Sequence, residues 1–150
     1  MTISFFVTFH DRSAPSLRID ASERARVIDL VSSTAGIEQA FLYTPAQATD
    51  PYLHDGAPPQ LILQCHFTQV EAFERAVAAD GPFQRLAAPS TLPSLANAAV
   101  KQQAMLARTL PVPEPQFRTP PGHLPCSYLV SYPGPAADLN AWLHHYITSH

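Results

Sequence analysis

The sequence predicts a fold of the α+β class, with a βαββαβ unit in residues 1–110. Short apolar segments with β-branched and aromatic residues, which are typical of strands, alternate with stretches of helical period. Signals that begin and end helices lie between them. A third observation is an internal repeat, because residues 4–9 and 127–132 both read serine, aromatic, large apolar, valine, hydroxyl, aromatic. Such a repeat indicates that one architectural unit occurs twice.

Residues 3–10 form the first predicted strand, and alternation gives this strand two different faces. The apolar face comprises Phe5, Val7 and Phe9, and the mixed face comprises Ser4, Phe6, Thr8 and His10. The apolar face is suited to packing under helices. The mixed face, with hydroxyls, a ring and an imidazole, has the character of a ligand-cavity wall.

The first predicted helix follows a loop over residues 11–19. Asp20 is its expected N-cap, and Glu23 stands three residues later at the capping-box position. The apolar stripe of this helix comprises Val27, Leu30, Val31 and Ala35. Gly36 follows the last apolar position and is expected to end the helix.

Residues 37–44 and 60–67 are the second and third predicted strands. A polar, proline-broken loop over residues 45–59, which contains His54 and Asp55, separates them. In the third strand, Leu61, Leu63, Cys65 and Phe67 share an apolar face, and Gln60, Ile62, Gln64 and His66 share a mixed face. The mixed faces of the first and third strands have the same character, which favours a common pocket.

Thr68 and Glu71 form a second predicted capping box, at the start of the second helix. The side of this helix that is expected to be buried comprises Val70, Phe73, Ala76 and Val77, and Asp80, Gly81 and Pro82 stop the helix. Residues 83–99 are expected to be irregular, with a short helical turn near Leu95. Residues 100–110 are the fourth predicted strand, although alanine and glutamine dilute its pattern.

This order describes a ferredoxin-like unit with an antiparallel sheet and both helices on one face. The other face carries Phe6 and Ile62 and requires a partner sheet to cover it. Six of the sixteen prolines crowd residues 111–125, which we expect to be a semi-rigid extended linker. Residues 126–150 are predicted to be the βα start of a second, incomplete repeat.

Composition disfavours several classes of protein. The nine Lys and Arg residues are scattered singly and the net charge is −3, so nucleic-acid binding is disfavoured. No apolar run approaches the roughly 20 residues of a membrane-spanning helix, and no charged-then-apolar leader opens the chain. Cys65 and Cys126 lie in predicted strands without CxxC spacing, which is typical of buried thiols in a reducing compartment. We therefore expect a soluble cytoplasmic protein.

Residues 142–150 read Trp-Leu-His-His-Tyr-Ile-Thr-Ser-His, after an apolar strand, a Pro-Gly turn and the start of an amphipathic helix. This stretch resembles the His-Tyr-x-x-x-His pattern of EthD-like proteins, which belong to the dimeric α/β-barrel superfamily. The resemblance implies two ferredoxin-like halves that close face to face around a largely apolar pocket. It also implies His145, Tyr146 and His150 as candidate catalytic residues.

The pocket is expected to be lined by the mixed strand faces of both repeats. Its predicted lining residues are Phe6, Thr8, His10, Ile62, Gln64, His66, Leu129 and Ser131. The chain supplies one half-barrel and the first third of another, so a homodimer or an intramolecular pairing of repeats is needed to complete the wall. A fragment of a longer tandem protein is favoured, because the last helix has full apolar periodicity without a capping glycine.

Each candidate histidine admits a functional and a structural interpretation. His150 acts near Tyr146 as a general acid or base, or it is an imidazolium favoured by the helix dipole. His10 and His66 line the pocket mouth, or each donates a hydrogen bond at a strand end. No two histidines have the spacing of helix-borne metal ligands, and no residue stands out as a haem ligand. We expect neither a metal nor a cofactor.

Two functional hypotheses follow. The first is a cofactor-independent enzyme that acts on a small hydrophobic, aromatic or polyketide-like compound. In it a pocket histidine moves a proton during oxygenation, isomerisation or decarboxylation, the reactions that the resemblance implies. The second is a non-catalytic module that binds a ligand or dimerises, because a fold alone does not decide function.

Overall fold

The computed structural model describes residues 1–46, 51–52, 56–109, 114, 116, 118–123, 127–132 and 134–149. The chain divides into two compact units, Met1–Pro120 and Pro121–His150. The predictions made for His54, Asp55, Cys126 and His150, and for part of the linker at 111–125, lie outside the described residues.

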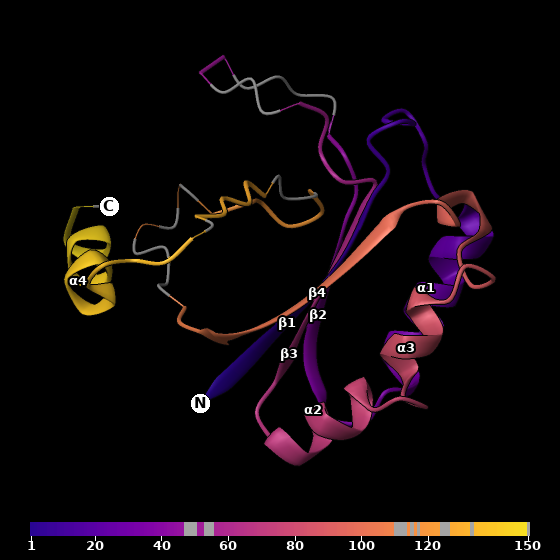
Figure 1. The fold of residues 1–150 in the computed structure, drawn as a ribbon, viewed down its shortest axis with the longest axis horizontal. Helices are drawn as coiled ribbons and strands as arrows, with labels where there is room; N and C mark the ends of the chain where they lie inside the picture. Colours follow the sequence, from indigo (N-terminus) through magenta and orange to yellow (C-terminus); the bar gives the residue numbers. More distant parts are fainter. Residues whose placement is uncertain are drawn as a thin grey trace. The chain divides into compact units, whose positions relative to one another are not determined.

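A four-stranded sheet forms the centre of the first unit. Its strands are β1 (Thr2–His10), β2 (Ile37–Tyr43), β3 (Leu61–Phe67) and β4 (Ala99–Ala107). Their spatial order is β2-β3-β1-β4, and all neighbouring strands are antiparallel. The helices α1 (Ala21–Ser33), α2 (Val70–Val77) and α3 (Pro82–Ala87) lie on one face of the sheet (Figure 1). This topology is that of a ferredoxin-like unit, and the predicted α+β class is confirmed.

The helix-covered face of the sheet forms the core. It carries the strand residues that alternation assigned to the apolar side, all of them buried: Phe5, Val7, Phe9, Leu61, Leu63, Cys65 and Phe67. The ring of Phe83 in α3 lies among them, with its centroid 4.9 Å from that of Phe5 and 6.2 Å from that of Phe67. Burying an aromatic or aliphatic side chain of this size contributes roughly 1.5–3 kcal/mol. The strand phase predicted from alternation is thus confirmed in β1 and β3.

Helix α1 begins as the sequence predicts. The Asp20 carboxylate accepts from the Glu23 amide at 2.8 Å, and the Glu23 carboxylate accepts from the Asp20 amide at 2.9 Å. The other oxygen of Glu23 accepts from the Ser94 amide at 2.7 Å. Ser94 lies in a short 3₁₀ helix, η1 (Pro93–Leu95), so one buried carboxylate joins the start of α1 to a segment distant in sequence.

Gly36 occupies the turn after α1 and meets two constraints at once. Its φ is +87°, a value that side chains with a Cβ rarely adopt. A Cβ at this position would also collide with Ala72 of α2. Glycine therefore allows α1 to turn directly into β2 beneath α2.

The start of α2 differs from the prediction. Gln69 is the N-cap and makes no side-chain capping bond, while the Thr68 hydroxyl donates to the Glu38 carboxylate at 3.2 Å. The capping box predicted at Thr68 is wrong, because this hydroxyl finds its partner on the neighbouring strand. Val70 is 41% exposed rather than buried, and Ala72 takes the core position.

Residues 83–99 contain more helix than the sequence predicts. Pro82 ends the segment after α2 but also begins α3, which buries Phe83 and Leu86. A proline is well suited to the first turn of a helix, where its missing N–H has no intrahelical partner in any case. The turn expected near Leu95 is present as η1.

Gln60 is wholly buried and lies just before β3, outside the strand in which it was predicted. Its side-chain oxygen accepts from the Asp11 amide at 2.8 Å, and its side-chain nitrogen donates to the carbonyls of Asp11 and Ala14 at 2.9 and 3.0 Å. The side chain thus satisfies backbone groups of the loop that follows β1. Pairing with this loop explains why a polar residue is tolerated in the interior.

The second unit contains helix α4 (Leu139–Ser149), and the Asp138 carboxylate accepts from the Ala141 amide at its start, at 2.9 Å. The strand predicted at residues 127–132 is not formed, since these residues belong to no helix or sheet. A strand needs a neighbouring backbone for its hydrogen bonds, and no described segment of this unit supplies one. Tyr132 packs instead against Trp142, with ring centroids 5.4 Å apart.

We expect Glu23→Gln to lower the free energy of unfolding by about 1–3 kcal/mol at neutral pH, because an amide offers one acceptor where two backbone N–H groups need one each. Burial acts to raise the pKa of Glu23, but the hydrogen bonds from Ser94 and Asp20 outweigh it and hold the pKa below its usual value of 4.5. The ionised Glu23 carboxylate therefore stabilises the fold fully at pH values above its pKa in the unfolded protein. This contribution is lost as the pH falls through the pKa of Glu23 in the folded protein.

Urea unfolding of both proteins at neutral pH and at a series of pH values below 4.5 measures this effect. The difference between wild type and Glu23→Gln is expected to shrink as the solution becomes more acidic. A difference that stays constant across the series would contradict the role assigned to the ionised carboxylate.

Candidate functional site

We call the sheet face opposite the helices the open face (Figure 1), and all four strands contribute side chains to it. The strand register places there Ser4, Phe6, Thr8 and His10 of β1, Ile62, Gln64 and His66 of β3, Gln39, Phe41 and Tyr43 of β2, and Ala99, Lys101, Gln103 and Met105 of β4. All the pocket residues predicted in β1 and β3 are on this face. It is therefore the first candidate for a functional surface.

A hydrogen-bonded chain of side chains crosses the open face from β2 to β1. The Tyr43 hydroxyl donates to Gln64 Oε1 at 2.8 Å, and Gln64 Nε2 donates to the Ser4 hydroxyl at 2.9 Å. Gln64 Nε2 also lies 2.9 Å from His66 Nε2. Gln64 is thus the central member of a chain that joins three strands. We call these four side chains the Gln64 network.

Aromatic rings border the Gln64 network on the β2 side. The rings of Phe41 and Tyr43 are stacked, with centroids 6.1 Å apart and an interplanar angle of 19°. The Phe41 ring also meets the His66 ring edge to face, with centroids 5.9 Å apart and an interplanar angle of 68°. The surface therefore combines flat apolar rings with a small number of oriented polar groups, which is the usual make-up of a site for a small apolar ligand.

Phe41 and Tyr43 reach the open face because β2 contains a β-bulge. The pairing of β2 with β3 shifts between Ile37 and Gln39, and Glu38 is the extra residue. Without it, strict alternation from Ile37 would place both aromatic rings on the core face. Phe41 and Tyr43 were not among the site residues predicted from the sequence. The alternation of these two rings with the apolar Ala40 and Leu42 was the sequence signal that could have placed them on one face.

The two histidines predicted on this face are not close to each other. His66 pairs with Ser4, near the start of β1, whereas His10 is the last residue of that strand. Six residues of strand at about 3.4 Å each separate the two positions by roughly 20 Å. A joint site of His10 and His66 at one pocket mouth is therefore wrong. His66 is the histidine that belongs to the Gln64 network.

The remaining predicted site residues belong to the second unit. Leu129 and Ser131 lie in the exposed segment at 127–132. On α4, the Tyr146 ring is stacked on Trp142 with centroids 5.3 Å apart, and His145 Nδ1 lies 3.3 Å from the Ser149 hydroxyl. No described residue of α4 is buried within the unit.

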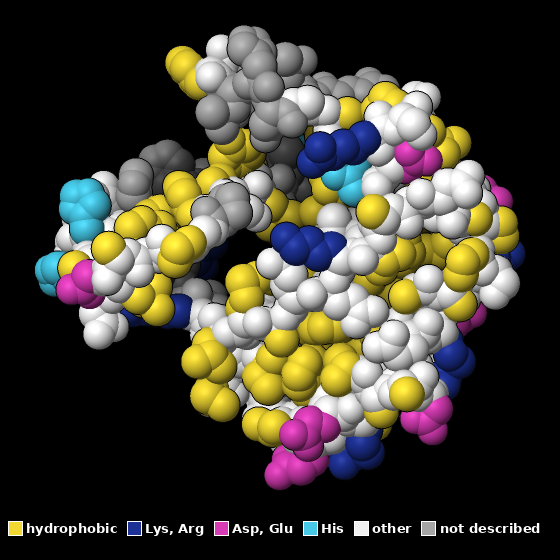
Figure 2. All heavy atoms as spheres, in the orientation of Figure 1, with side chains coloured by type: hydrophobic (Ala, Val, Ile, Leu, Met, Phe, Trp, Pro, Cys, Tyr) yellow, Lys and Arg dark blue, Asp and Glu magenta, His cyan; other side chains and the backbone are white. Residues whose placement is uncertain are grey.

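Lys and Arg side chains lie apart from one another on the side of the molecule that Figure 2 shows. Within the part of the chain that the structure describes, no group of three or more His, Cys, Asp or Glu side chains is placed to bind a metal ion. No helix among these residues is long and apolar enough to span a membrane. Cys65 is buried in the core, and burial raises its pKa to about 12, so it is no candidate nucleophile.

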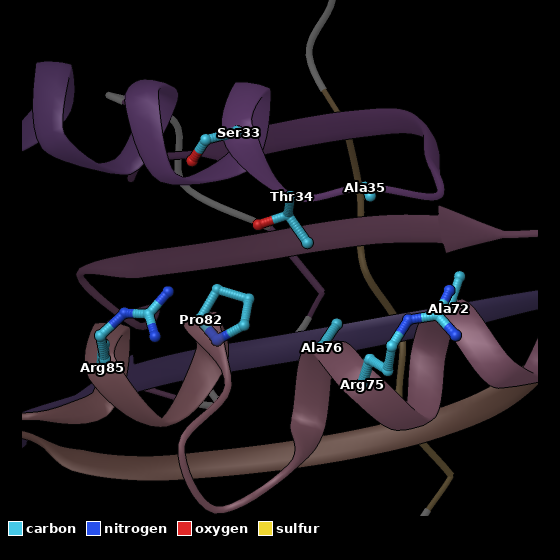
Figure 3. Close-up of a pocket in the computed structure, with 8 residues that line it drawn as sticks. All are labelled: Ser33, Thr34, Ala35, Ala72, Arg75, Ala76, Pro82 and Arg85. Atoms are coloured by element: carbon cyan, nitrogen blue, oxygen red, sulfur yellow. The ribbon is translucent and has the colours of Figure 1, made fainter.

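A shallow pocket of about 160 Å³ lies on the helical side of the sheet (Figure 3). Its floor is made of small residues, and its polar lining consists of Ser33, Thr34, Arg75 and Arg85. The two hydroxyls both donate to the Leu30 carbonyl, at 3.1 and 2.6 Å. The two arginines lie on opposite sides and do not point toward one another (Figure 3). This pocket therefore lacks the convergent donors that an anion site requires.

No family model matches the sequence, and no curated protein matches it. The solved structures that this chain is similar to include a variant of SnoaB, a cofactor-independent oxygenase from Streptomyces nogalater, with 20% identity and a TM-score of 0.48 over 75% of this chain and 98% of that one. An EthD family protein from Bacillus halodurans has 10% identity and a TM-score of 0.47, over 72% of this chain and 100% of that chain.

A dimeric ferredoxin-like protein of unknown function from Jannaschia has 16% identity and a TM-score of 0.48, over 71% of this chain and 100% of that chain. The suspected likeness to EthD-like and other dimeric ferredoxin-like proteins is thus found among solved structures. With TM-scores below 0.5, these likenesses carry no inference about the activity of this chain.

We expect Tyr43→Phe and Ser4→Ala each to lower the free energy of unfolding by about 0.5–1.5 kcal/mol, since each removes one hydrogen bond of Gln64. Because both bonds restrain one amide group, the double variant should depart from additivity by about 0.5 kcal/mol or more. Urea unfolding of the two single variants and the double variant gives this coupling.

The matched control is Thr8→Val, which alters a side chain of the open face that makes no described hydrogen bond to Gln64. Its effect should add to that of Tyr43→Phe. Equal coupling in both pairs would argue against a connected Gln64 network.

Proposed function

We propose that the open face of the first unit binds a small hydrophobic compound, with an aromatic ring system as the best match. The observation that carries this proposal is the Gln64 network beside the stacked rings of Phe41 and Tyr43. Flat rings bind a flat apolar compound by contact area, and fixed polar groups orient it. Phe6 and Ile62 add apolar surface on the neighbouring strands.

The proposal includes a cover for the open face. A half-buried sheet face with apolar side chains is stable in water only when its apolar area is small or covered. A second sheet would cover this face and enclose the ligand. This sheet would come from a second copy of the chain or from a second repeat in an EthD-like barrel. A cytoplasmic location is part of the same proposal.

We also propose that residues 126–150 are the start of such a second repeat, after a linker at 111–125. Residues 127–132 share the pattern of β1, and α4 follows them as α1 follows β1. In the described unit the segment has no neighbouring strand. Pairing with an added strand would convert it to the predicted conformation and bring Leu129 and Ser131 onto a sheet face.

Binding of a panel of small aromatic compounds to the protein tests the first proposal. Shifts of backbone amide signals in NMR spectra should concentrate in β1, β2 and β3. His66→Ala should weaken binding by roughly two- to tenfold, the value of one hydrogen bond.

His10→Ala is the matched control, because His10 lies on the same face but outside the Gln64 network. It should leave the affinity unchanged. An equal loss of affinity in both variants, or shifts confined to the helices, would contradict a site at the Gln64 network.

A catalytic function is the second candidate, with His145, Tyr146 and His150 as acid–base residues that move a proton during cofactor-independent oxygenation, isomerisation or decarboxylation. The favouring observation is that the Tyr146 ring contacts two other rings, with its centroid 5.3 Å from that of Trp142 and 5.8 Å from that of Tyr132. A ring fixed in this way keeps its hydroxyl in a defined place on α4. The alternative remains a module that binds a ligand or dimerises without catalysis.

Turnover of the same aromatic panel distinguishes the catalytic candidate from a binding module. His150→Ala should reduce turnover by about 10²-fold or more if the imidazole is the general acid or base. His144→Ala is the control on the same helix and should have no effect. Equal turnover in wild type and His150→Ala would remove His150 from the mechanism, and binding without any turnover would favour the non-catalytic module.

A further inference from the structure

We propose that Gln64 is a positioning residue that holds His66 as the neutral tautomer with its proton on Nδ1, so that His66 offers a ligand a hydrogen-bond donor. The ligand would then carry an acceptor oxygen, such as an aromatic ketone or a phenolate. This inference rests on the proposed binding function and names the chemical group that the site selects.

The hydrogen-bond capacity of Gln64 supports this assignment. A glutamine amide has one acceptor oxygen and two N–H donors. Tyr43 donates to the oxygen, and the nitrogen faces Ser4 and His66, each at 2.9 Å. In this orientation the Gln64 oxygen accepts from Tyr43, and its two N–H groups have Ser4 and His66 as partners.

Rotating the amide by half a turn would use these groups less fully. The nitrogen, with two hydrogens, would then face only the Tyr43 oxygen among the three partners, and one N–H would be left without a partner among them. An unsatisfied donor in a half-buried position costs about 1–3 kcal/mol. The arrangement with nitrogen toward Ser4 and His66 is favoured for this reason.

The tautomer of His66 follows from that orientation. An amide N–H can donate to His66 Nε2 only if that nitrogen has a lone pair and no proton. In a neutral imidazole the proton is then on Nδ1. His66 thus has its basic nitrogen engaged by Gln64, and the nitrogen left for a ligand is a donor.

This arrangement distinguishes two chemical roles for His66. A general base needs a free lone pair directed at the substrate, whereas a donor stabilises a carbonyl or an oxyanion. The geometry supports the second role. The Tyr43 hydroxyl, Gln64 and Ser4 act through His66 and need not bond to the ligand, while the Tyr43 ring still offers it contact area.

Ring ¹⁵N NMR of His66 at about pH 8, where an ordinary histidine is neutral, reads the tautomer directly. We expect Nε2 without a proton and Nδ1 with one. In Gln64→Glu the carboxylate only accepts, so Nε2 of His66 should carry a proton, while Tyr43 and Ser4 can still donate hydrogen bonds to the carboxylate. Gln103→Glu makes the same change on β4 of the open face and should leave the His66 spectrum as in wild type.

A proton on Nε2 in the wild-type protein would overturn the inference, as would an unchanged spectrum in Gln64→Glu. The wild-type spectrum decides the tautomer even if the variant does not fold. Neither result depends on a ligand, so the tautomer is tested separately from the proposed binding function.

The ligand class is tested with two probes of one shape, α-tetralone and tetralin, which differ in the carbonyl group. We expect the wild type to prefer α-tetralone by roughly two- to tenfold, and Gln64→Glu to lose this preference while Gln103→Glu keeps it. Equal affinity of the two probes for the wild type would overturn the donor role. Failure of both to bind would contradict the proposed function, while the ¹⁵N result would still decide the tautomer.

Discussion

The β-bulge in β2 is the constraint on which the candidate site depends. One extra residue, Glu38, reverses the faces of the strand beyond it. The apolar Ala40 and Leu42 then pack against the core, and the two aromatic side chains between and after them reach the open face. With a regular strand Gln64 would lack the phenol that orients its amide. The polar chain on the sheet would then have no fixed direction.

Much of the fold could be predicted from local sequence, because the determinants are local. Asp20 and Glu23 signal a helix start, and period-2 patterns in β1 and β3 give the buried faces. The start of α2 and the presence of α3 could not be predicted in this way. Thr68 binds a residue of another strand, and Pro82 serves as the start of a helix in addition to ending a segment. Both outcomes depend on tertiary neighbours or on a second role of the same residue.

The candidate site was predicted in part. Alternation in β1 and β3 correctly grouped Gln64 and His66 with Phe6, since that inference needs only the strand period. It also grouped His10 with His66, but sharing a face does not imply proximity when the strand register is unknown. Tyr43 was not assigned, because a bulge interrupts the period and has no strong local signature. Residues 127–132 show the same limit, since a sequence with a strand pattern forms no strand without a neighbouring backbone to pair with.

The buried thiol of Cys65 has a practical consequence for following motions of the sheet. It lies on β3, directly between the two open-face residues Gln64 and His66, but points into the core. Because only a thiolate reacts and burial suppresses ionisation, alkylating reagents can modify it only when the central strands separate from the helices. The rate at which Cys65 is alkylated therefore reports how often the protein interior opens, at a residue of the strand that carries the proposed site.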